Sequence, residues 1–312
     1  YYHALDLFGN VPFVTENDPI GSFLPPQISR ANLFNYIESE LKAIETLLKP
    51  AKSNEYARVD ASSAWALLAK LYLNAEVYTG SGKYTEAVTY CNKIIAISGY
   101  SLVGTYRFMF LADNNATSNS EVIFPVTFDG NKTRTWGGTT YLVHAPIVGS
   151  MSPGTHGVDF GWGGLRTTKQ FVQKFADPSG ATDKRASFHS SGQNLDINDI
   201  SVATDGYGII KYINVTSTGA TGSNLTWVDT DYPMFRLAEI YLIYAEAVLR
   251  GGAGGDASTS LNYINLLRQR AYGNTSGNIT AGQLTLQFIL DERARELYWE
   301  ATRRTDLIRY GQ

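Results

Sequence analysis

The stretch PMFRLAEIYLIYAEAVLRGG, residues 233–252, opens the part of the chain that decides its fold. Pro233 suits a first helical turn, where its missing N–H would have no partner anyway. Gly251 and Gly252 suit the end of a helix, where a left-handed residue is favoured. The apolar residues between them recur three and four positions apart, as on one helical face: Leu237, Ile240, Tyr241, Tyr244, Ala245 and Val248. The stretch therefore predicts an amphipathic helix beginning near Pro233.

Two more helices are predicted after it. SLNYINLLRQRA, residues 260–271, repeats its apolar residues with helical spacing. LQFILDERARELYWEATRRTDLIRYG, residues 286–311, is dense in charge, and its acids precede bases by four positions at Asp291/Arg295 and Glu300/Arg304. That order suits ion pairs on a helix surface. The pattern favours a solvated, ion-paired face for the DERARE segment.

The order and spacing of three motifs carry a resemblance to a known family. RLAEIYLIYAEA is followed by IN-x-x-R-x-RA and then by ERARELYWE-x-x-R-x-x-DLIRYG. This order resembles the C-terminal signature of the SusD/RagB family, glycan-binding lipoproteins of the Bacteroidetes outer membrane. Weaker similarities lie at residues 7–16, 164–175, 183–188 and 206–212. The resemblance therefore runs through most of the chain.

The resemblance implies a mostly α fold, in which a tetratricopeptide-like helical scaffold carries a loop-rich central region with minor β structure. It implies non-catalytic capture of a polysaccharide or oligosaccharide on the cell surface, and delivery to a TonB-dependent (SusC-like) outer-membrane transporter. Family members are usually longer and carry a signal peptide and a lipid-bearing cysteine. We therefore expect a truncated or internal portion of a protein anchored at the extracellular face of the outer membrane, with the lipid anchor outside this chain.

Composition and charge exclude several classes of protein. Apolar residues make up 44% of the chain and charged residues 18%, which is typical of a folded protein. A net charge of -3 without a run of Lys or Arg predicts no nucleic-acid partner. No apolar run approaches the length of about eighteen residues that a membrane span needs. The single Cys91 excludes an internal disulfide, and its apolar helical surroundings predict burial.

The N-terminal part repeats the helical pattern of the C-terminal part. Ser29 is expected to cap a helix that ends at Pro50, and two further helices are expected over residues 60–78 and 83–97. Their sequence is typical of a tetratricopeptide helix pair. Leu68-Ala69-x-Leu71-Tyr72-Leu73 aligns with Leu237-Ala238-x-Ile240-Tyr241-Leu242. Because stacked repeats bury their apolar faces against neighbours, we expect the two blocks to pack together.

The middle of the chain is rich in Gly, Thr, Ser and Asn. EVIFPVTFDG, residues 121–130, alternates like a strand, and its Pro125 favours a sheet edge. Residues 206–214 predict another strand and residues 164–175 a helix, while the rest is expected to form long loops. We predict one domain over residues 1–312. It comprises an N-terminal segment with helices at 1–98, a loop-rich ligand-binding region at 99–230 and a C-terminal helical block at 231–312.

Aromatic residues in this middle part are the candidates for a glycan site. A sugar ring has apolar CH faces and a polar rim, so its site needs exposed aromatic planes beside hydrogen-bonding groups. Tryptophans between loops and helices can equally be buried packing, and Trp227 is the weakest candidate of the three. Trp65 and Trp299 are expected within helices. The candidate ligand-binding residues are Trp136, Tyr141, His156, Asp159, Trp162, Arg166 and Trp227.

Two other classes of function are weighed against glycan binding. For a glycoside hydrolase, no carboxylate pair is placed at the required spacing, and the sequence has no HExxH, G-x-S-x-G or P-loop motif. We therefore expect no catalytic residue, no metal site and no cofactor. The acidic stretch at residues 194–205 could bind calcium, but it lacks the EF-hand glycine and terminal glutamate, which favours a solvated loop. A tetratricopeptide-like scaffold that binds a protein or peptide is the stronger alternative.

Overall fold

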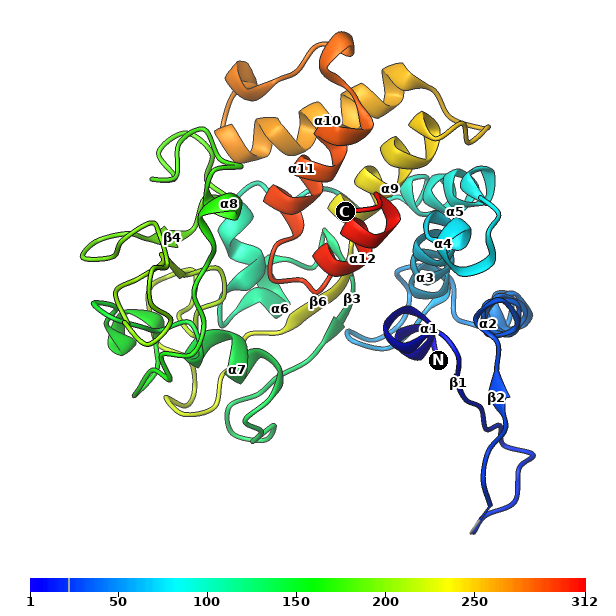
Figure 1. The fold of residues 1–312 in the computed structure, drawn as a ribbon, viewed down its shortest axis with the longest axis horizontal. Coiled ribbons are helices and arrows are strands. Elements are labelled where there is room, and N and C mark those ends of the chain that lie inside the picture. Colours follow the sequence, from blue (N-terminus) through cyan, green and yellow to red (C-terminus); the bar gives the residue numbers. More distant parts are fainter. Residues whose placement is uncertain (22) are drawn as a thin grey trace.

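Helices from the two ends of the chain pack side by side, with the loops of the middle part beside them (Figure 1). The computed structural model describes residues 1–21 and 23–312. The N-terminal helices are α1 (Tyr2–Phe8), α2 (Arg30–Ile44), α3 (Ala61–Leu73), α4 (Ala75–Thr79) and α5 (Tyr84–Ile95). The C-terminal helices are α9 (Leu237–Leu249), α10 (Ala257–Tyr272), α11 (Leu286–Leu297) and α12 (Arg303–Arg309).

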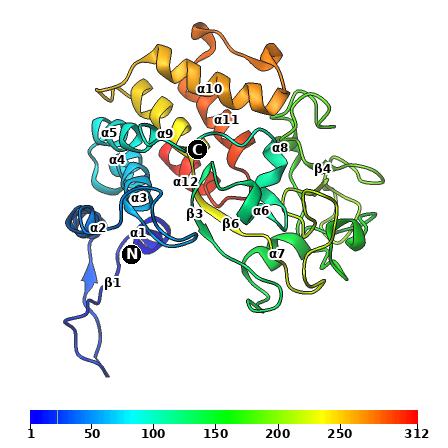
Figure 2. The same ribbon diagram turned by 180° about the vertical axis from the view of Figure 1, so that it is seen from behind.

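One apolar core joins the two blocks. Leu71 of α3, Val88 of α5 and Ile243 of α9 belong to the same buried cluster, and α9 packs on α10 as α3 packs on α5. Figure 2 shows α5 and α9 adjacent from behind as well. Fully buried Ala69 and Ala247 leave room for neighbouring helices. The prediction that the two helix pairs pack together is confirmed.

The ends of the N-terminal helices follow local capping. Ser29 caps α2 by accepting a hydrogen bond from the N–H of Asn32, as predicted, but α2 ends at Ile44, before Pro50. Asp60 forms a capping box with Ser63 at the start of α3. The single helix expected over residues 60–78 is divided at Asn74 into α3 and α4. Cys91 of α5 is buried, as its pattern predicted.

The named strands form three antiparallel pairs within the described residues. They are β1 (Val11–Pro12) with β2 (Gln27–Ile28), β3 (Val122–Val126) with β6 (Tyr232–Arg236), and β4 (Phe188–His189) with β5 (Gly208–Ile209). Pro233 therefore lies in β6, and the helix expected to begin there begins at Leu237. The expectation was wrong because β6 pairs with β3, where Pro125 lies opposite Pro233. Neither proline can donate a backbone hydrogen bond.

The middle part holds only short helices between its loops. These are η1 (Tyr106–Phe110), α6 (Asn114–Thr117), α7 (Gly138–His144), η2 (Pro153–His156) and α8 (Lys169–Val172), while η3 (Thr275–Gly277) and η4 (Ala281–Gln283) lie between α10 and α11. The helix expected over 164–175 is reduced to α8, whose Phe171 packs on Tyr298. The strand expected over 206–214 is reduced to β5. In residues 1–21 and 23–312, no helix is both long and apolar enough to cross a membrane.

Most of the DERARE segment is buried, so the predicted solvated face is wrong. Glu292 and Glu296 have no exposed surface and Arg293 is 2% exposed, because α11 packs against α9. Arg185 donates to Glu292 over 2.7 Å, and Arg293 donates to Asp306 over 2.9 Å. A buried charge needs such a partner, since its desolvation otherwise costs several kcal/mol. The motif that contains DERARE therefore supplies buried, paired charges to the interior of the C-terminal block.

The charged residues of the two expected i, i+4 pairs have other partners, one of them three positions away within α11 and the rest on other segments. Asp291 binds Lys174, and Arg295 binds Glu292 over 2.7 Å. Glu300 binds Arg236 of β6 over 2.7 Å and Lys211 over 2.6 Å. These buried carboxylates are met by bases from the middle part and from β6, which tertiary packing brings to them.

Acid is expected to destabilise the fold through these carboxylates. Burial opposes ionisation of Glu292, but Arg185, Arg295 and Arg268 outweigh it and lower its pKa to about 2. An unfolded glutamate has a pKa of about 4.3. A lowered folded pKa gives stability that is fully present above the unfolded pKa and is lost as the pH falls through the folded pKa. We therefore expect near-UV circular dichroism to be lost progressively between about pH 4 and pH 2. An unchanged spectrum down to the lower limit would contradict this.

Candidate functional site

The structure brings the three candidate tryptophans together on the loop side of the molecule. Trp136 precedes α7, Trp162 lies in the loop before α8, and Trp227 lies in the loop before β6. The ring centroid of Trp136 is 4.3 Å from that of Trp227 and 5.9 Å from that of Trp162. Tyr141 of α7 packs edge-on to Trp162, and Phe160 lies 6.3 Å from Trp136. We call these five residues the aromatic cluster.

Much of the aromatic cluster faces solvent. Trp136 is 53% exposed, Tyr141 and Phe160 are also exposed, and Trp162 and Trp227 are half-buried. Grouped aromatic rings at a surface are an unusual use of apolar side chains and mark a binding site more often than single exposed residues do. Their flat faces can contact the CH face of a sugar ring.

Hydrogen bonds hold the loops of the cluster against each other. The hydroxyl of Thr226 donates to the carboxylate of Asp159 over 2.6 Å, and the N–H of Asp159 donates to the carbonyl of Leu225 over 3.1 Å. The side-chain oxygen of Asn224 accepts from the N–H groups of Thr226 and Trp227. Such a turn fixes the backbone beside Trp227. The site is therefore largely formed before any ligand binds, which reduces the entropy lost on binding.

The other candidates are placed differently. Asp159 lies beside the cluster and joins two of its loops. His156 is 6% exposed, and its ring contacts the carbonyl of Ser152 at 2.8 Å, so burial leaves it little surface for a ligand. The guanidinium of Arg166 donates to the carbonyls of Ile200 and Val202, which ties down a neighbouring loop.

Two residues near the site were not among the candidates. Phe160 could have been found from its position two residues before Trp162 in a glycine-rich stretch. His144, which stacks on Trp162, lies three residues after Tyr141 in α7, on the same side of that helix. Trp299, expected within a helix, lies after the end of α11 with a φ of 61°.

Gly138 allows the turn that carries Trp136. Its φ is 58°, and a Cβ atom there would lie 2.1 Å from the ring of Phe128. We expect Gly138→Ala to displace the chain around Trp136 and to weaken ligand binding, with a loss of stability of about 1–3 kcal/mol. Binding and urea unfolding measure the two effects. Gly282→Ala is the matched control, because open space surrounds its Cβ position. If Gly138→Ala and Gly282→Ala had the same ligand affinity and the same stability, the role assigned to Gly138 would be contradicted.

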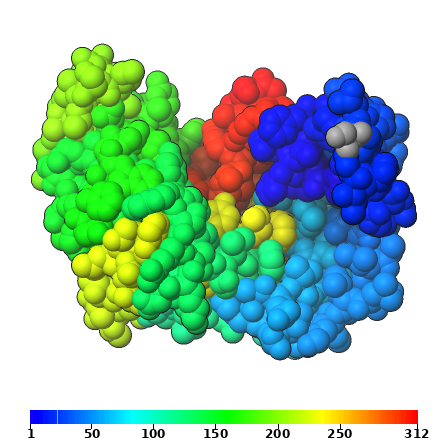
Figure 3. Space-filling model, turned by 90° about the horizontal axis from the view of Figure 1, so that it is seen from below, coloured from blue at the N-terminus to red at the C-terminus, as the bar shows by residue number. Residues whose placement is uncertain are grey.

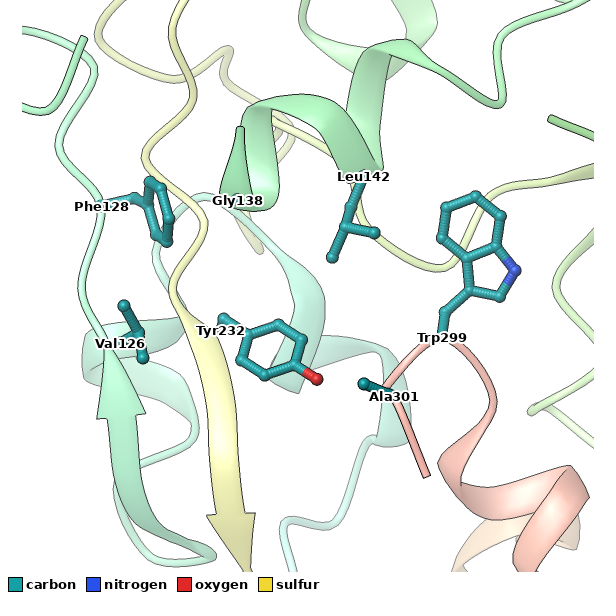
Figure 4. Close-up of a pocket in the computed structure, with 7 residues that line it drawn as sticks. All are labelled: Val126, Phe128, Gly138, Leu142, Tyr232, Trp299 and Ala301. Carbon is teal, nitrogen blue, oxygen red and sulfur yellow. The ribbon is translucent and has the colours of Figure 1, made fainter. Parts of the chain in front are cut away.

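An apolar cavity lies beside α7, which contributes Gly138 and Leu142 to its lining (Figure 4). Its volume is about 470 Å³, and its lining residues are Val126, Phe128, Gly138, Leu142, Tyr232, Trp299 and Ala301. A second cavity, of about 520 Å³, shares Leu142 and Trp299 with it and reaches His3 of α1. In Figure 3 the red C-terminal residues are seen between the green loops and the blue N-terminal block. Because the first cavity offers almost no hydrogen-bonding group, it suits a sugar less well than the aromatic cluster does.

Acidic groups do not assemble into a metal site in the part of the chain that the structure describes. Within the stretch at residues 194–205, the carboxylate of Asp205 accepts from the side chain of Asn194 and from the N–H groups of Asn198 and Asp199. These bonds lower the pKa of Asp205 and close the loop on itself.

Comparisons with known proteins give one family. The sequence model of the SusD family matches residues 194–312. The starch-binding protein SusD of Bacteroides thetaiotaomicron is 36% identical over 356 aligned residues, which take in 100% of this chain and 62% of that protein. The chain is similar to the SusD family in both comparisons.

Solved SusD structures have the same fold. A SusD superfamily protein of Parabacteroides distasonis superposes with a TM-score of 0.75 at 24% identity, covering 99% of this chain and 65% of that one. Surface glycan-binding protein A of Bacteroides thetaiotaomicron, solved with laminarihexaose, gives a TM-score of 0.75 at 24% identity. The superposition covers 100% of this chain and 66% of that one. The mostly α fold with a loop-rich middle is therefore also the fold of these two proteins. The chain spans 62% of the length of the starch-binding relative.

Proposed function

We propose that this chain captures a polysaccharide or oligosaccharide without cleaving it, and that the aromatic cluster is its binding surface. The observation that carries the proposal is the group of exposed rings on loops fixed by hydrogen bonds. The names of two related proteins describe binding, one of starch and one of glycans at the cell surface. The candidate residues are Trp136, Tyr141, Trp162 and Trp227, with Asp159 at the edge.

The shape of the cluster favours a curved glycan. The ring of Trp136 is tilted by 57° from that of Trp162 and by 55° from that of Trp227. Rings at such angles cannot all lie flat on one straight ribbon. They can contact successive sugars of a chain that bends, as a helical glucan does. Hydroxyls on the rim of each sugar would be read by polar side chains such as Asp159.

We propose the cellular role from the family. The complete protein would be held by a lipid anchor at the extracellular face of the outer membrane. There it would pass its glycan to a SusC-like TonB-dependent transporter. The helical scaffold would support that partner, while the loops meet the glycan. Co-purification of the complete protein with such a transporter, followed by glycan binding to the complex, tests this assignment.

Affinity electrophoresis tests the binding proposal. The protein would be run through gels that contain soluble starch, laminarin or hydroxyethylcellulose, and each glycan would be analysed for cleavage afterwards. We expect retardation by starch or laminarin, no retardation by the straight cellulose chain, and no product. Cleavage would replace the proposal with a hydrolase, and free migration in all three gels would refute it.

A further inference from the structure

A cavity with basic walls lies at the C-terminal end of α10, apart from the aromatic cluster. Its volume is about 560 Å³, which falls within the range of small-molecule sites. Its walls come mainly from η1, from the loop before β4 and from the end of α10. None of its lining residues belongs to the aromatic cluster. We call it the basic cavity.

The charged side chains that line the basic cavity are all bases. They are Arg107 of η1, Lys184 of the loop and Arg270 of α10, and no acidic residue of the described chain lines the cavity with them. The chain as a whole has a net charge of -3, so the positive charge here is local. An anion would therefore be attracted to this cavity and not to the protein surface in general.

Two of the three bases keep hydrogen-bond donors for a ligand. Arg107 is exposed, and within the described residues its guanidinium forms no ion pair and donates no hydrogen bond. The Nζ atom of Lys184 donates to the carbonyl oxygens of Gly180 and Ala181. Because an ammonium group has three donors, one N–H of Lys184 is still available.

The loop that carries Lys184 is fixed before any ligand binds. The backbone N–H of Lys184 donates to the carbonyl oxygen of Ala271, near the end of α10, over 2.9 Å. The acids of this loop already have partners. Asp183 binds Arg185 over 2.7 Å, and Asp177 accepts from backbone N–H groups of its own turn. These acids therefore leave the charge of Lys184 to the cavity.

Arg270 forms the inner wall. Its guanidinium binds Glu121 over 2.7 Å and also binds Glu296, and it lies 5.2 Å from the centre of the Tyr106 ring. Two carboxylates thus neutralise Arg270, and the charge offered to a ligand comes from Arg107 and Lys184. The buried Nε atom of Arg270 has no hydrogen-bond partner among the described residues, so the cavity adjoins a donor that the protein leaves without an acceptor.

We propose that the basic cavity is a second binding site, which takes an acidic sugar with its carboxylate or sulfate group between Arg107 and Lys184. A guanidinium binds such groups through paired hydrogen bonds. The cavity is much larger than a bare ion, and Tyr106 and Phe188 give it aromatic walls for the CH face of a sugar ring. That a sugar carries the charge rests on the proposed function, whereas the preference for an anion rests on the cavity alone.

Isothermal titration with matched sugars tests the preference for an anion. One pair is trigalacturonic acid and its methyl ester, and the other is sulfated galactotriose and plain galactotriose. At pH 7 and low salt, we expect one acidic probe to bind at least about tenfold more tightly than its neutral match, and the advantage to shrink as salt is added. The pair that shows the difference identifies the group as carboxylate or sulfate. Equal affinities within both pairs, or no binding by either acidic probe, would overturn the inference.

Two substitutions at Gly104 separate charge from shape. Gly104 lines the basic cavity, and open space surrounds its Cβ position, so Asp and Asn both fit there. Gly104→Asp brings a carboxylate that repels the ligand and competes for Arg107, so affinity for the acidic probe should fall at least about tenfold. Gly104→Asn has the same shape without the charge and should bind clearly better. Equal binding by the two variants would contradict the site.

A second variant removes the proposed ligand contact itself. Arg107→Ser should also lower affinity for the acidic probe about tenfold or more, with an unchanged melting temperature, because the side chain is exposed. Arg58→Ser is the control, since it removes the same charge from a 70% exposed side chain outside the cavity. If both variants bound the acidic probe alike, Arg107 would not be a ligand contact and the inference would fail.

Starch gels distinguish this inference from the proposed function. Gly104→Asp should be retarded by starch as the wild type is, because Gly104 lies outside the aromatic cluster. A protein that binds the acidic probe but migrates freely in starch and laminarin would refute the proposed role of the aromatic cluster and keep the second site. A protein that is retarded by starch but treats acidic and neutral probes alike would refute the second site and keep the proposed function.

Discussion

Trp136→Ala is expected to weaken glycan binding by about 2 kcal/mol or more, which is roughly thirtyfold. Trp136 is the most exposed tryptophan of the cluster and contacts both Trp162 and Trp227. Its loss would remove the largest flat face available to a sugar. Because half of the side chain is already in solvent, the melting temperature should change little. Affinity electrophoresis in soluble starch and isothermal titration with maltoheptaose measure the effect.

Phe8→Ala is the matched control for this variant. Phe8 is 74% exposed at the end of α1 and is not one of the residues of the aromatic cluster. We expect the control to bind as the wild type does. If Trp136→Ala bound glycan as the wild type does and its fold were unchanged, the binding site would lie outside the aromatic cluster. A collapse of the melting temperature would instead make Trp136 a packing residue.

Arg236→Ala is expected to lower the melting temperature by about 10 °C or more, or to prevent folding. Arg236 is 1% exposed in β6. Its guanidinium donates to Glu121 over 3.0 Å, to Glu296 over 2.7 Å and to Glu300 over 2.7 Å. Breaking a buried pair costs about 3–5 kcal/mol, because a charge is left without a partner, and here three carboxylates lose one. Thermal unfolding followed by circular dichroism measures the loss, and the soluble yield reports a failure to fold.

Two further variants separate charge from location. Arg236→Lys keeps the charge but cannot present the planar fork of donors, so we expect an intermediate melting temperature. Arg58→Ala removes a solvated pair, in which Arg58 is 70% and Glu55 74% exposed, and should leave the melting temperature unchanged. If Arg236→Ala melted like Arg58→Ala, the buried network would contribute no net stability.

Much of the helical scaffold could be predicted from the sequence. Leu237, Ile240 and Tyr244 lie on one face because the helical repeat alone puts them there. The aligned pattern in α3 and α9 also predicted that the two blocks pack together, since each has an apolar face that a neighbour must cover. The local pattern was wrong at Pro233. The backbone there pairs with β3 and forms a strand instead of the first turn of a helix.

The candidate site was predictable in composition only. Trp136, Trp162 and Trp227 stood out as aromatic residues in polar loops, but nothing in their spacing fixed which of them would meet. His156 and Asp159 looked alike as polar neighbours, yet one is buried and the other joins two loops of the cluster. His144 lies three residues after Tyr141, but only the tertiary structure shows the two carbonyl oxygens that flank its ring.

The sequence by itself determined the resemblance to the SusD/RagB family, the helical faces, the buried Cys91 and the aromatic composition of the middle part. These features follow from residue type and from spacing along one segment, so they can be predicted without knowing any contact between distant segments. Only the tertiary structure decided that DERARE is interior, that Arg236 joins three carboxylates, and that three tryptophans share one surface. Those facts depend on contacts between different segments of the chain, such as Arg236 and Glu300, which are 64 residues apart. No local pattern encodes which distant partner a charge or a ring will meet.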